Sequence, residues 1–366
     1  MLMFFSLASS ASHIRYLNLT WRPVSGRTVE FKFSYAQAGT ASVGQQLNFG
    51  INTGAGSVTI PTRVTSNNTA ENYFYAEGTA LYTYPANGNY TAAFSTCCRI
   101  FGMVNNSSGS VYVGTTVNVG TGNSSPIATL PPVVNVSRGV LATFTLPAND
   151  PDGDALSYRL ATPSEMGGGS QPAGLSVNSS TGLVTFNTTN ASIGQLYSAA
   201  IIVGDGKTSI TVDFIIKITQ QSIPPVFDYL VTPASGTVFQ VSPGQAVNFN
   251  LKATDSDAGD NVQLSGVGIP LGAVTLPSLP RSGNPVQSSF SWTPSNSNLG
   301  TNVINFIAQD NQGVQTTTSV TIQVSLKPIF NSPPTPAGNF TTFVTAGNVI
   351  NLTIQASDPD PNDNVQ

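Results

Sequence analysis

The chain has 366 residues, of which 40% are hydrophobic and only 8% are charged, whereas about a quarter of a typical soluble domain is charged. Its net charge is −4, and no run of its 13 Lys and Arg residues forms a basic patch, which argues against a nucleic-acid partner. Abundant Gly and Pro, without long helical periodicity, indicate an all-β protein, and the length suits three or four domains.

The first eleven residues, MLMFFSLASSA, have a short apolar core followed by small residues. Ser9 and Ala11 stand at the −3 and −1 positions of a signal-peptidase site, so we interpret residues 1–11 as a secretory signal. No other segment approaches the roughly 20 apolar residues of a membrane helix. An anchor is therefore expected only beyond Gln366.

Residues 12–122, which we call the first unit, are predicted to form an N-terminal β-sandwich. They contain strand-like segments such as VEFKFSY and a group of six aromatic residues. Aromatic residues on alternating strands usually fill a sandwich core, but they also form platforms on which sugars stack. The six residues are Tyr73, Phe74, Tyr75, Tyr82, Tyr84 and Tyr90.

The two cysteines, Cys97 and Cys98, are adjacent in the sequence. They either close a vicinal disulfide, pair with another chain or remain free. Because neighbouring residues of a strand point to opposite faces, the simplest expectation is one buried and one exposed thiol.

The remainder of the chain contains a repeat of about one hundred residues, the size of one sandwich domain. Its marker is an acidic loop: ANDPDGDALSY at 148–158, ATDSDAGDNVQL at 253–264 and ASDPDPNDNVQ at 356–366. A second Asp, in IIVGDGKT and FIAQDNQG, follows the first two loops at the same distance. The repeat defines a second unit (123–221), a third unit (222–326) and the truncated start of a fourth (327–366).

Strands next to these loops alternate between apolar and polar residues, which predicts antiparallel sheets packed through one apolar face. Pro-rich joints, such as SIPPVF at 222–227, separate the units and stiffen the links between them. The apolar positions are Val247, Phe249, Leu251 and Ala253 before the second loop, and Ile210, Val212, Phe214, Ile216 and Ile218 or Val320, Ile322, Val324 and Leu326 in the final strands.

The second unit resembles the cadherin-like and immunoglobulin-like repeats of large extracellular surface proteins. Its acidic loop is similar to a cadherin calcium loop, and QPAGLSVNSSTGLVTFNTT resembles the Pro-x-Gly-Leu…Thr-Gly hallmark of immunoglobulin-like repeats. FSWTPSNSNLGTNVINFIAQDNQG in the third unit is similar to repeats of bacterial adhesins. In the first unit, LNFGINTG and YTYPANGNYTAAF resemble the polycystic-kidney-disease sandwich, although Ile51 and Asn52 replace its usual Gly-Asp-Gly ending.

The acidic loops have the ligand spacing of a metal site, because calcium takes six to eight hard oxygens from carboxylates and carbonyls. The cadherin resemblance implies that the first two Asp of each loop are ligands. The Leu-Asp-Arg-Glu and Asp-x-Asn-Asp segments of that family are absent, which favours a single weak site of about 10⁻⁴–10⁻³ M affinity over a three-ion junction. A simple Asp turn is the alternative. The predicted ligands are Asp150, Asp152, Asp154, Asp205, Asp255, Asp257, Asp260, Asp310, Asp358 and Asp360.

Catalysis has little support in the sequence. His13 is the only histidine, so a Ser-His-Asp triad or a zinc site lacks its parts. Asn-x-Ser/Thr sequons are only weakly enriched over chance; they are glycan acceptors in a eukaryotic secretory pathway and have no such meaning in a bacterium. They begin at Asn18, Asn67, Asn89, Asn105, Asn106, Asn123, Asn135, Asn178, Asn187, Asn190, Asn339 and Asn351.

The sequence thus predicts a non-enzymatic extracellular or cell-surface protein made of tandem immunoglobulin- and cadherin-like sandwiches. We expect a structural or adhesive role, calcium at the acidic loops, and a cell-surface protein or a glycan as partner. The alternative, motivated by the aromatic residues of the first unit, is a carbohydrate-binding accessory region of a secreted enzyme.

Overall fold

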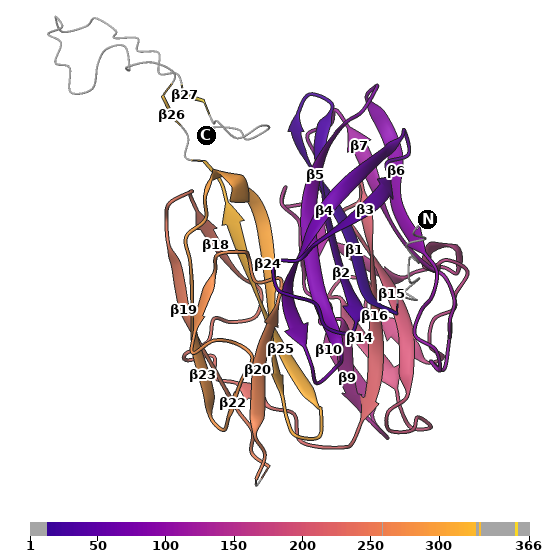
Figure 1. Ribbon diagram of the computed structural model, residues 1–366, viewed down its shortest axis with the longest axis vertical. Coiled ribbons are helices and arrows are strands. Elements are labelled where there is room, and N and C mark those ends of the chain that lie inside the picture. Colours follow the sequence, from indigo (N-terminus) through magenta and orange to yellow (C-terminus); the bar gives the residue numbers. More distant parts are fainter. Residues whose placement is uncertain (1–12, 258, 327–328, 331–355, 358–366) are drawn as a thin grey trace, which may run out of the picture.

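The computed structural model describes residues 13–257, 259–326, 329–330 and 356–357. These residues form strands and two short 3-10 helices, η1 (Ser164–Met166) and η2 (Asn296–Asn298), which confirms the all-β class (Figure 1). No helix within these ranges has the length and apolar character needed to cross a bilayer. The predicted signal at 1–11, most of the fourth unit, and Asp358 and Asp360 lie outside the described residues.

The first unit is a sheet of seven strands that pair antiparallel in the order β1-β2-β5-β4-β3-β6-β7. Long alternating strands rich in aromatic and β-branched residues fit this pleated, half-buried arrangement. The strands are β1 (Ile14–Ser25), β2 (Thr28–Ala38), β3 (Gln46–Asn52), β4 (Ser57–Asn68), β5 (Tyr73–Thr83), β6 (Gly88–Thr96) and β7 (Val111–Val119).

The second unit contains a three-stranded sheet, β10-β14-β13, and contributes β12, β15, β16 and β9 to the sheet of the first unit. A short antiparallel pair joins β8 with β11. The strands are β8 (Ile127–Ala128), β9 (Val133–Ser137), β10 (Leu141–Thr145), β11 (Ala148–Asn149), β12 (Ser157–Leu160), β13 (Leu175–Val177), β14 (Leu183–Asn187), β15 (Leu196–Gly204) and β16 (Ser209–Thr219).

The third unit is a sandwich of two sheets, β17-β19-β23-β21 and β18-β25-β24-β20-β22. The predicted alternation of β19 is confirmed, because Val247, Leu251 and Ala253 are buried while Asn248 and Asn250 are exposed. The strands are β17 (Val226–Phe227), β18 (Thr237–Val241), β19 (Val247–Thr254), β20 (Val262–Val267), β21 (Val274–Leu276), β22 (Arg281–Gly283), β23 (Val286–Trp292), β24 (Gly300–Gln309) and β25 (Gln315–Val324), followed by the pair β26 (Ile329–Phe330) and β27 (Ala356–Ser357).

Strand β16 belongs to both the first and the second unit. Beyond its hairpin with β15, it pairs with β7 at Ile210 and with β1 at Val212 and Asp213. The predicted apolar face of this strand is confirmed, because Ile210, Val212 and Phe214 are fully buried, but Thr211 and Asp213 on the other face are also buried, at 3% and 1% exposed. The side chain of Asp213 pairs with Arg99 of the first unit, and Thr211 Oγ1 accepts a hydrogen bond from the amide of Gly114 in β7.

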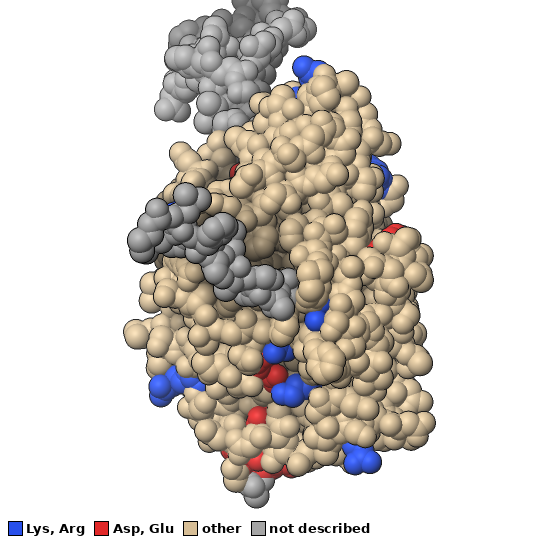
Figure 2. All heavy atoms as spheres, turned by 45° about the vertical axis from the view of Figure 1, so that its right-hand side comes forward, with Lys and Arg blue, Asp and Glu red and all other residues tan. Residues whose placement is uncertain are grey.

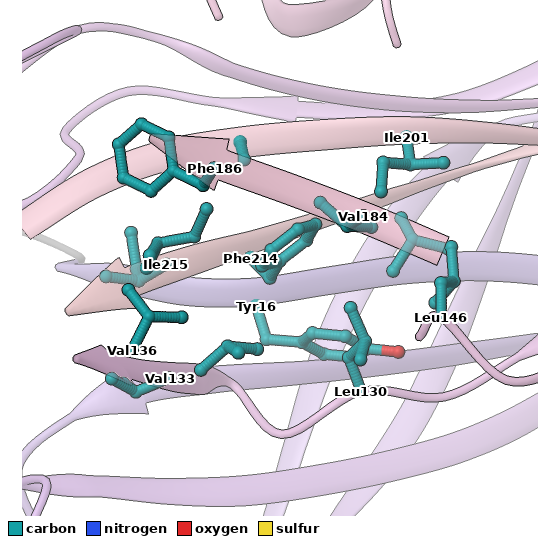
Figure 3. Close-up of a cluster of buried hydrophobic side chains, with 14 of the residues drawn as sticks. Tyr16, Leu130, Val133, Val136, Leu146, Val184, Phe186, Ile201, Phe214 and Ile215 are labelled. Carbon is teal, nitrogen blue, oxygen red and sulfur yellow. The ribbon is translucent and has the colours of Figure 1, made fainter. Parts of the chain in front are cut away.

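The hydrophobic cluster around β16 continues into the neighbouring units. Figure 3 shows Tyr16 of β1 packed with Leu130, Val133 and Phe214 of the second unit. Val267 and Ile307 of the third unit belong to the same cluster. The apolar core therefore crosses the Pro-rich joints instead of ending at them.

A buried carboxylate in the first unit joins all three units. Glu71, in the turn between β4 and β5, accepts hydrogen bonds from Asn135 Nδ2 at 2.8 Å and from Lys217 Nζ at 2.9 Å, both in the second unit. Gln309 Nε2 of the third unit lies 3.4 Å from the same carboxylate. In Figure 1 the third unit, in orange, accordingly lies beside the strands of the first two. The described units dock side by side.

The cysteines form a vicinal disulfide between Cys97 and Cys98, directly after β6. The expectation of one buried and one exposed free thiol is therefore wrong. It assumed continuing strand geometry, whereas the chain turns here, with a positive φ of 82° at Cys98. The next residue, Arg99, is buried and forms a bidentate ion pair with Asp213 of β16, at 3.0 and 2.6 Å.

Candidate metal centres at two acidic corners

Two clusters of three Asp side chains lie at strand ends in the second and third units. Strands β11 and β15 end directly before two Asp of the first cluster, and β19 and β24 end directly before two of the second. Within each cluster, one carboxylate oxygen from every residue lies within 4.8 Å of the others. We call them corner A (Asp150, Asp154 and Asp205) and corner B (Asp255, Asp260 and Asp310).

Local turn geometry fixes the first Asp of each loop. Asp150 Oδ1 accepts hydrogen bonds from the backbone amides of Asp152 (2.9 Å) and Asp154 (3.1 Å). Asp255 Oδ1 accepts one from the amide of Asp257 at 2.8 Å. This is the Asp turn that the sequence offered as the alternative to a metal site. It occupies only one of the two carboxylate oxygens in each case.

The second oxygens remain without a partner. In the described part of the chain, Asp150 Oδ2 in corner A has no hydrogen-bond partner and is buried. In corner B the same holds for the Oδ2 atoms of Asp255, Asp260 and Asp310. A buried oxygen without a donor costs about 1–3 kcal/mol, and more when it is charged. The arrangement of both corners therefore favours a bound cation or a proton.

Burial changes the acidity of these groups. It raises the pKa of Asp150 to about 6, and the nearby charges of Asp152 and Asp205 add to the rise. Burial likewise raises the pKa of Asp310, with a contribution from Asp260. Burial alone would also raise the pKa of Asp205, but hydrogen bonds from Thr208, Asn123 and Lys207 outweigh it and lower that pKa.

These shifts predict that the metal-free protein becomes more stable on mild acidification. Because the pKa of Asp150 in the folded state (about 6) lies above its unfolded value near 3.9, the folded state takes up the proton first. The melting temperature in a chelator should rise between pH 7.5 and 5.5, and Asp150→Asn should reduce that rise. Asp228→Asn serves as the control, because the Lys252 partner lowers the pKa of Asp228, which titrates below this window. An equal pH response in Asp150→Asn and the parent would contradict the assignment.

The middle Asp of each loop binds the incoming linker. Asp152 Oδ2 accepts a hydrogen bond from the amide of Ser124 at 2.6 Å. Asp257 Oδ2 accepts bonds from Ser222 Oγ at 2.9 Å and from the amide of Ile223 at 3.1 Å. Neither belongs to a triad, although the cadherin resemblance implied that both are ligands. The structure thus brings together the outer Asp of each loop and the Asp from the next hairpin.

The two corners differ in countercharge. In corner A, Lys207 Nζ lies 2.7 Å from Asp154 Oδ2 and neutralises part of the cluster. None of the ion pairs formed by the described residues involves Asp255, Asp260 or Asp310 of corner B. The residue two positions after Asp310 is Gln312, whereas Lys207 stands two positions after Asp205. Corner B is therefore the more negative site.

Sequence reasoning missed two amides that organise the corners. Asn123 Nδ2 donates to Asp205 Oδ2 at 3.0 Å. Asn284, in the turn between β22 and β23, accepts from the amide of Asp255 at 3.0 Å and donates to the carbonyl of Asp260 at 3.1 Å. Neither position repeats between units, so spacing gave no signal for them.

Hard carboxylate oxygens without His or Cys ligands match the preferences of calcium, which accepts flexible geometry and binds six to eight oxygens. In each corner, one carboxylate oxygen from each of the three Asp lies within 4.8 Å of the other two, which supplies three hard oxygens to a cation. Figure 2 shows that charge is sparse on most of one molecular face and that Asp and Glu gather at its lower end. The donor set fits calcium better than a softer metal.

The aromatic group of the first unit does not form a surface platform. Tyr73, Phe74, Tyr75 and Tyr84 are at most 7% exposed and belong to the core. Tyr82 and Tyr90 are half-buried and pack against Tyr84, with ring centroids 4.8 and 4.4 Å away. The hypothesis of a sugar platform is corrected accordingly, because these strands turn most of their aromatic rings inward.

Sequence comparison finds family matches along most of the chain. Residues 15–120 match the family described as "Integrin beta-like protein A-E, N-terminal", and residues 127–224 match "Integrin beta-like protein A-E, second Ig-like domain". Residues 224–323 match "Bacterial Ig domain". Immunoglobulin-like sandwiches in the second and third units agree with the observed sheets.

Two curated relatives come from Dictyostelium discoideum. Integrin beta-like protein A is 29% identical over 90% of this chain, and Integrin beta-like protein C is 26% identical over 91%. The alignments cover 20% of either relative, so the chain spans about a fifth of their length. Among solved structures, Drosophila N-cadherin EC1-3 is 15% identical, with a TM-score of 0.27, over 59% of this chain and 76% of that chain.

Proposed function

We propose that this chain is an extracellular, non-catalytic structural or adhesive region whose second and third units are stabilised by calcium at corners A and B. The observation that supports this most is the recurrence of buried, unpartnered carboxylate oxygens at corresponding places in two units. A structural ion is expected in each repeated unit, whereas a catalytic carboxylate pair would be needed only once in the chain.

The similarity to integrin beta-like proteins supports an adhesive role at the cell surface, with a surface protein or a glycan as partner. The side-by-side docking around Glu71 and β16 supports a stiff body in place of a flexible string of domains. We keep the division into units at 12–122, 123–221, 222–326 and 327–366 as part of this proposal.

Calcium titration of the purified protein tests the proposal. In thermal unfolding experiments, added calcium should raise the melting temperature, with a midpoint of about 10⁻⁴–10⁻³ M. A ligand that binds only the folded state stabilises it by about 2.7 kcal/mol at one hundred times its Kd. Combining Asp255→Asn with Asp310→Asn should remove the contribution of corner B. Matched concentrations of NaCl control for ionic strength.

Asp257→Asn is the matched control within the same loop. It alters the bonds to Ser222 and Ile223 but leaves the triad intact, so the calcium response should persist. Equal loss of response in Asp257→Asn and in the triad variant would contradict the assignment of ligands. If calcium does not change the melting temperature of the parent protein, the proposed metal sites are overturned, and the two acidic loops are simple Asp turns.

Exchanging the residues that differ in charge between the corners should exchange their calcium affinities. Gln312→Lys places a cation where corner A has Lys207 and should weaken binding at corner B by roughly tenfold. Two unit charges about 4 Å apart interact by about 1 kcal/mol in water and by more near a protein surface. Lys207→Gln should strengthen corner A. Isothermal titration calorimetry of both variants checks the two directions, and unchanged affinities would contradict the role of countercharge.

A further inference from the structure

The chain carries many sequons, and the structure divides them by what the asparagine Nδ2 atom does. Nδ2 is the atom to which an N-linked glycan is attached. A glycan at a folded site therefore requires an exposed asparagine whose Nδ2 is not used inside the protein. The sequon asparagines in the described residues are Asn18, Asn67, Asn89, Asn105, Asn106, Asn123, Asn135, Asn178, Asn187 and Asn190.

Three of these asparagines are at most 5% exposed and use Nδ2 in buried hydrogen bonds, two of which join the first and second units. Asn18 Nδ2 donates to the carbonyl of Thr211 at 3.2 Å, where β1 meets β16. Asn135 Nδ2 donates to Glu71, and Asn123 Nδ2 donates to Asp205. A sugar on any of the three would occupy space that the neighbouring strand or unit fills.

Three further asparagines donate Nδ2 to backbone carbonyls of other segments. Asn67 Nδ2 donates to the carbonyl of Ala41 at 2.8 Å. The Nδ2 atoms of Asn105 and Asn106 both donate to the carbonyl of Ser170, at 2.7 and 2.8 Å, which fastens the loop after β6 to the second unit. A glycan at these positions would compete with those bonds.

Asn178 and Asn187 share a different geometry. Asn178 Oδ1 accepts hydrogen bonds from the amide and the hydroxyl of Ser180, each at 3.0 Å. Asn187 Oδ1 accepts the same pair from Thr189, at 3.0 and 2.7 Å. Both asparagines are exposed, and within the described residues neither Nδ2 donates to the protein. Because these bonds lie within three residues, they can form before the unit folds.

The surface beside these two asparagines gives an independent reason for a covering group. Asn187 of β14 pairs directly with Leu141 of β10, whose side chain is 66% exposed. The amide of Asn178 donates to the carbonyl of Leu183, whose side chain is 40% exposed. The exposed face of the β10-β14-β13 sheet thus carries a leucine next to each sequon and offers no charge to keep it soluble.

We propose that Asn178 and Asn187 carry N-linked glycans that shield this face, and that Asn18, Asn123 and Asn135 are not glycosylated. The inference rests on the extracellular location proposed above. Asn89 and Asn190 are also exposed, but they lack the bonds from the hydroxyl residue that Asn178 and Asn187 accept.

The reaction is a group transfer from a polyprenyl-pyrophosphate-linked oligosaccharide, which the secretory pathway supplies. The bond between C1 of the first sugar and the pyrophosphate oxygen breaks, and a bond between C1 and Nδ2 forms. Nδ2 loses one proton, and the polyprenyl pyrophosphate leaves. The Oδ1 bonds to Ser180 and Thr189 do not involve Nδ2 and survive the transfer.

The test is site-by-site glycan occupancy in the full chain, expressed with a secretion signal in a eukaryotic cell. Peptide:N-glycosidase treatment in ¹⁸O-labelled water converts each occupied Asn to a labelled Asp, which peptide mass spectrometry locates. Secreted and cell-retained protein are both analysed. Label is expected at Asn178 and Asn187 and not at Asn18, Asn123 or Asn135.

Ser180→Ala and Thr189→Ala remove one sequon each while retaining the asparagine, so each should abolish label at its own site only. Unlabelled Asn178 and Asn187 would overturn the proposal, as would label at the three buried asparagines. The calcium titration uses unglycosylated protein from bacteria and is therefore independent of the glycan mapping. A negative calcium result would not change the glycan result, and unoccupied sequons would not change the calcium result.

Discussion

Replacing Arg99 by methionine should destabilise the protein by about 3–5 kcal/mol, because it leaves the buried carboxylate of Asp213 without its cation. The two side chains are 0% and 1% exposed and form two hydrogen bonds across the junction of the first and second units. Burial raises the pKa of Asp213 and Arg99 opposes that rise, so losing Arg99 should raise the pKa further. Urea unfolding at pH 7.5 and 5.5 measures the loss, which should shrink at the lower pH.

The double variant Arg99→Met with Asp213→Leu is the decisive control. Replacing both partners of a buried ion pair by apolar residues is often neutral or stabilising, so the double variant should recover most of the lost stability. Arg159→Met breaks the exposed pair with Glu165 and should cost at most about 1 kcal/mol. Equal costs for the buried and the exposed pair would contradict the structure of this junction.

Replacing Phe214 by alanine should cost about 3–5 kcal/mol, because its ring is fully buried and packs edge to face on Phe144 at 5.9 Å. The substitution also tests the junction between the first and second units, because Phe214 lies on β16, the strand that both units share. Hydrogen exchange should therefore increase in β1 and β7 as well as in β15 and β16.

Phe306→Ala provides the matched comparison in the third unit. Phe306 is also fully buried, but its strand β24 pairs only with β20 and β25 in the described part of the chain. Its loss should increase exchange in those strands while β1 remains protected. If Phe214→Ala left β1 protected too, the first unit would fold independently of β16.

The acidic corners show how far spacing along the chain predicts a site. Asp205 and Asp310 follow their loops at equal distances, and a hairpin turn next to a strand end places each beside the loop. The spacing also placed Asp150, Asp154 and Asp255 among the predicted ligands, and all three belong to the observed triads. It did not separate Asp152 and Asp257, because the direction of a side chain within a turn depends on the linker that passes it.

For the aromatic residues the expected core role is confirmed over the sugar platform, whereas the expectation for the cysteines is wrong. Alternation along one strand says that a face is apolar, but it does not say what covers the other face. Tyr73 and Tyr75 lie on one strand in alternate positions with Phe74, and all three are buried because two different clusters receive them. Cys98 leaves the strand geometry on which the expectation for the thiols was based.

By itself, the amino-acid sequence determined the all-β class, the acidic repeat and the alternation of strands such as β19, because period and turn chemistry are local properties of the chain. Only the tertiary structure decided that β16 serves two units, that Glu71 joins three, and which carboxylate oxygens lack a partner. These features depend on contacts between residues far apart in sequence. The uncharged Asn, Ser and Thr side chains that make many of these contacts can face water equally well, so the sequence does not show which of them a neighbouring unit covers.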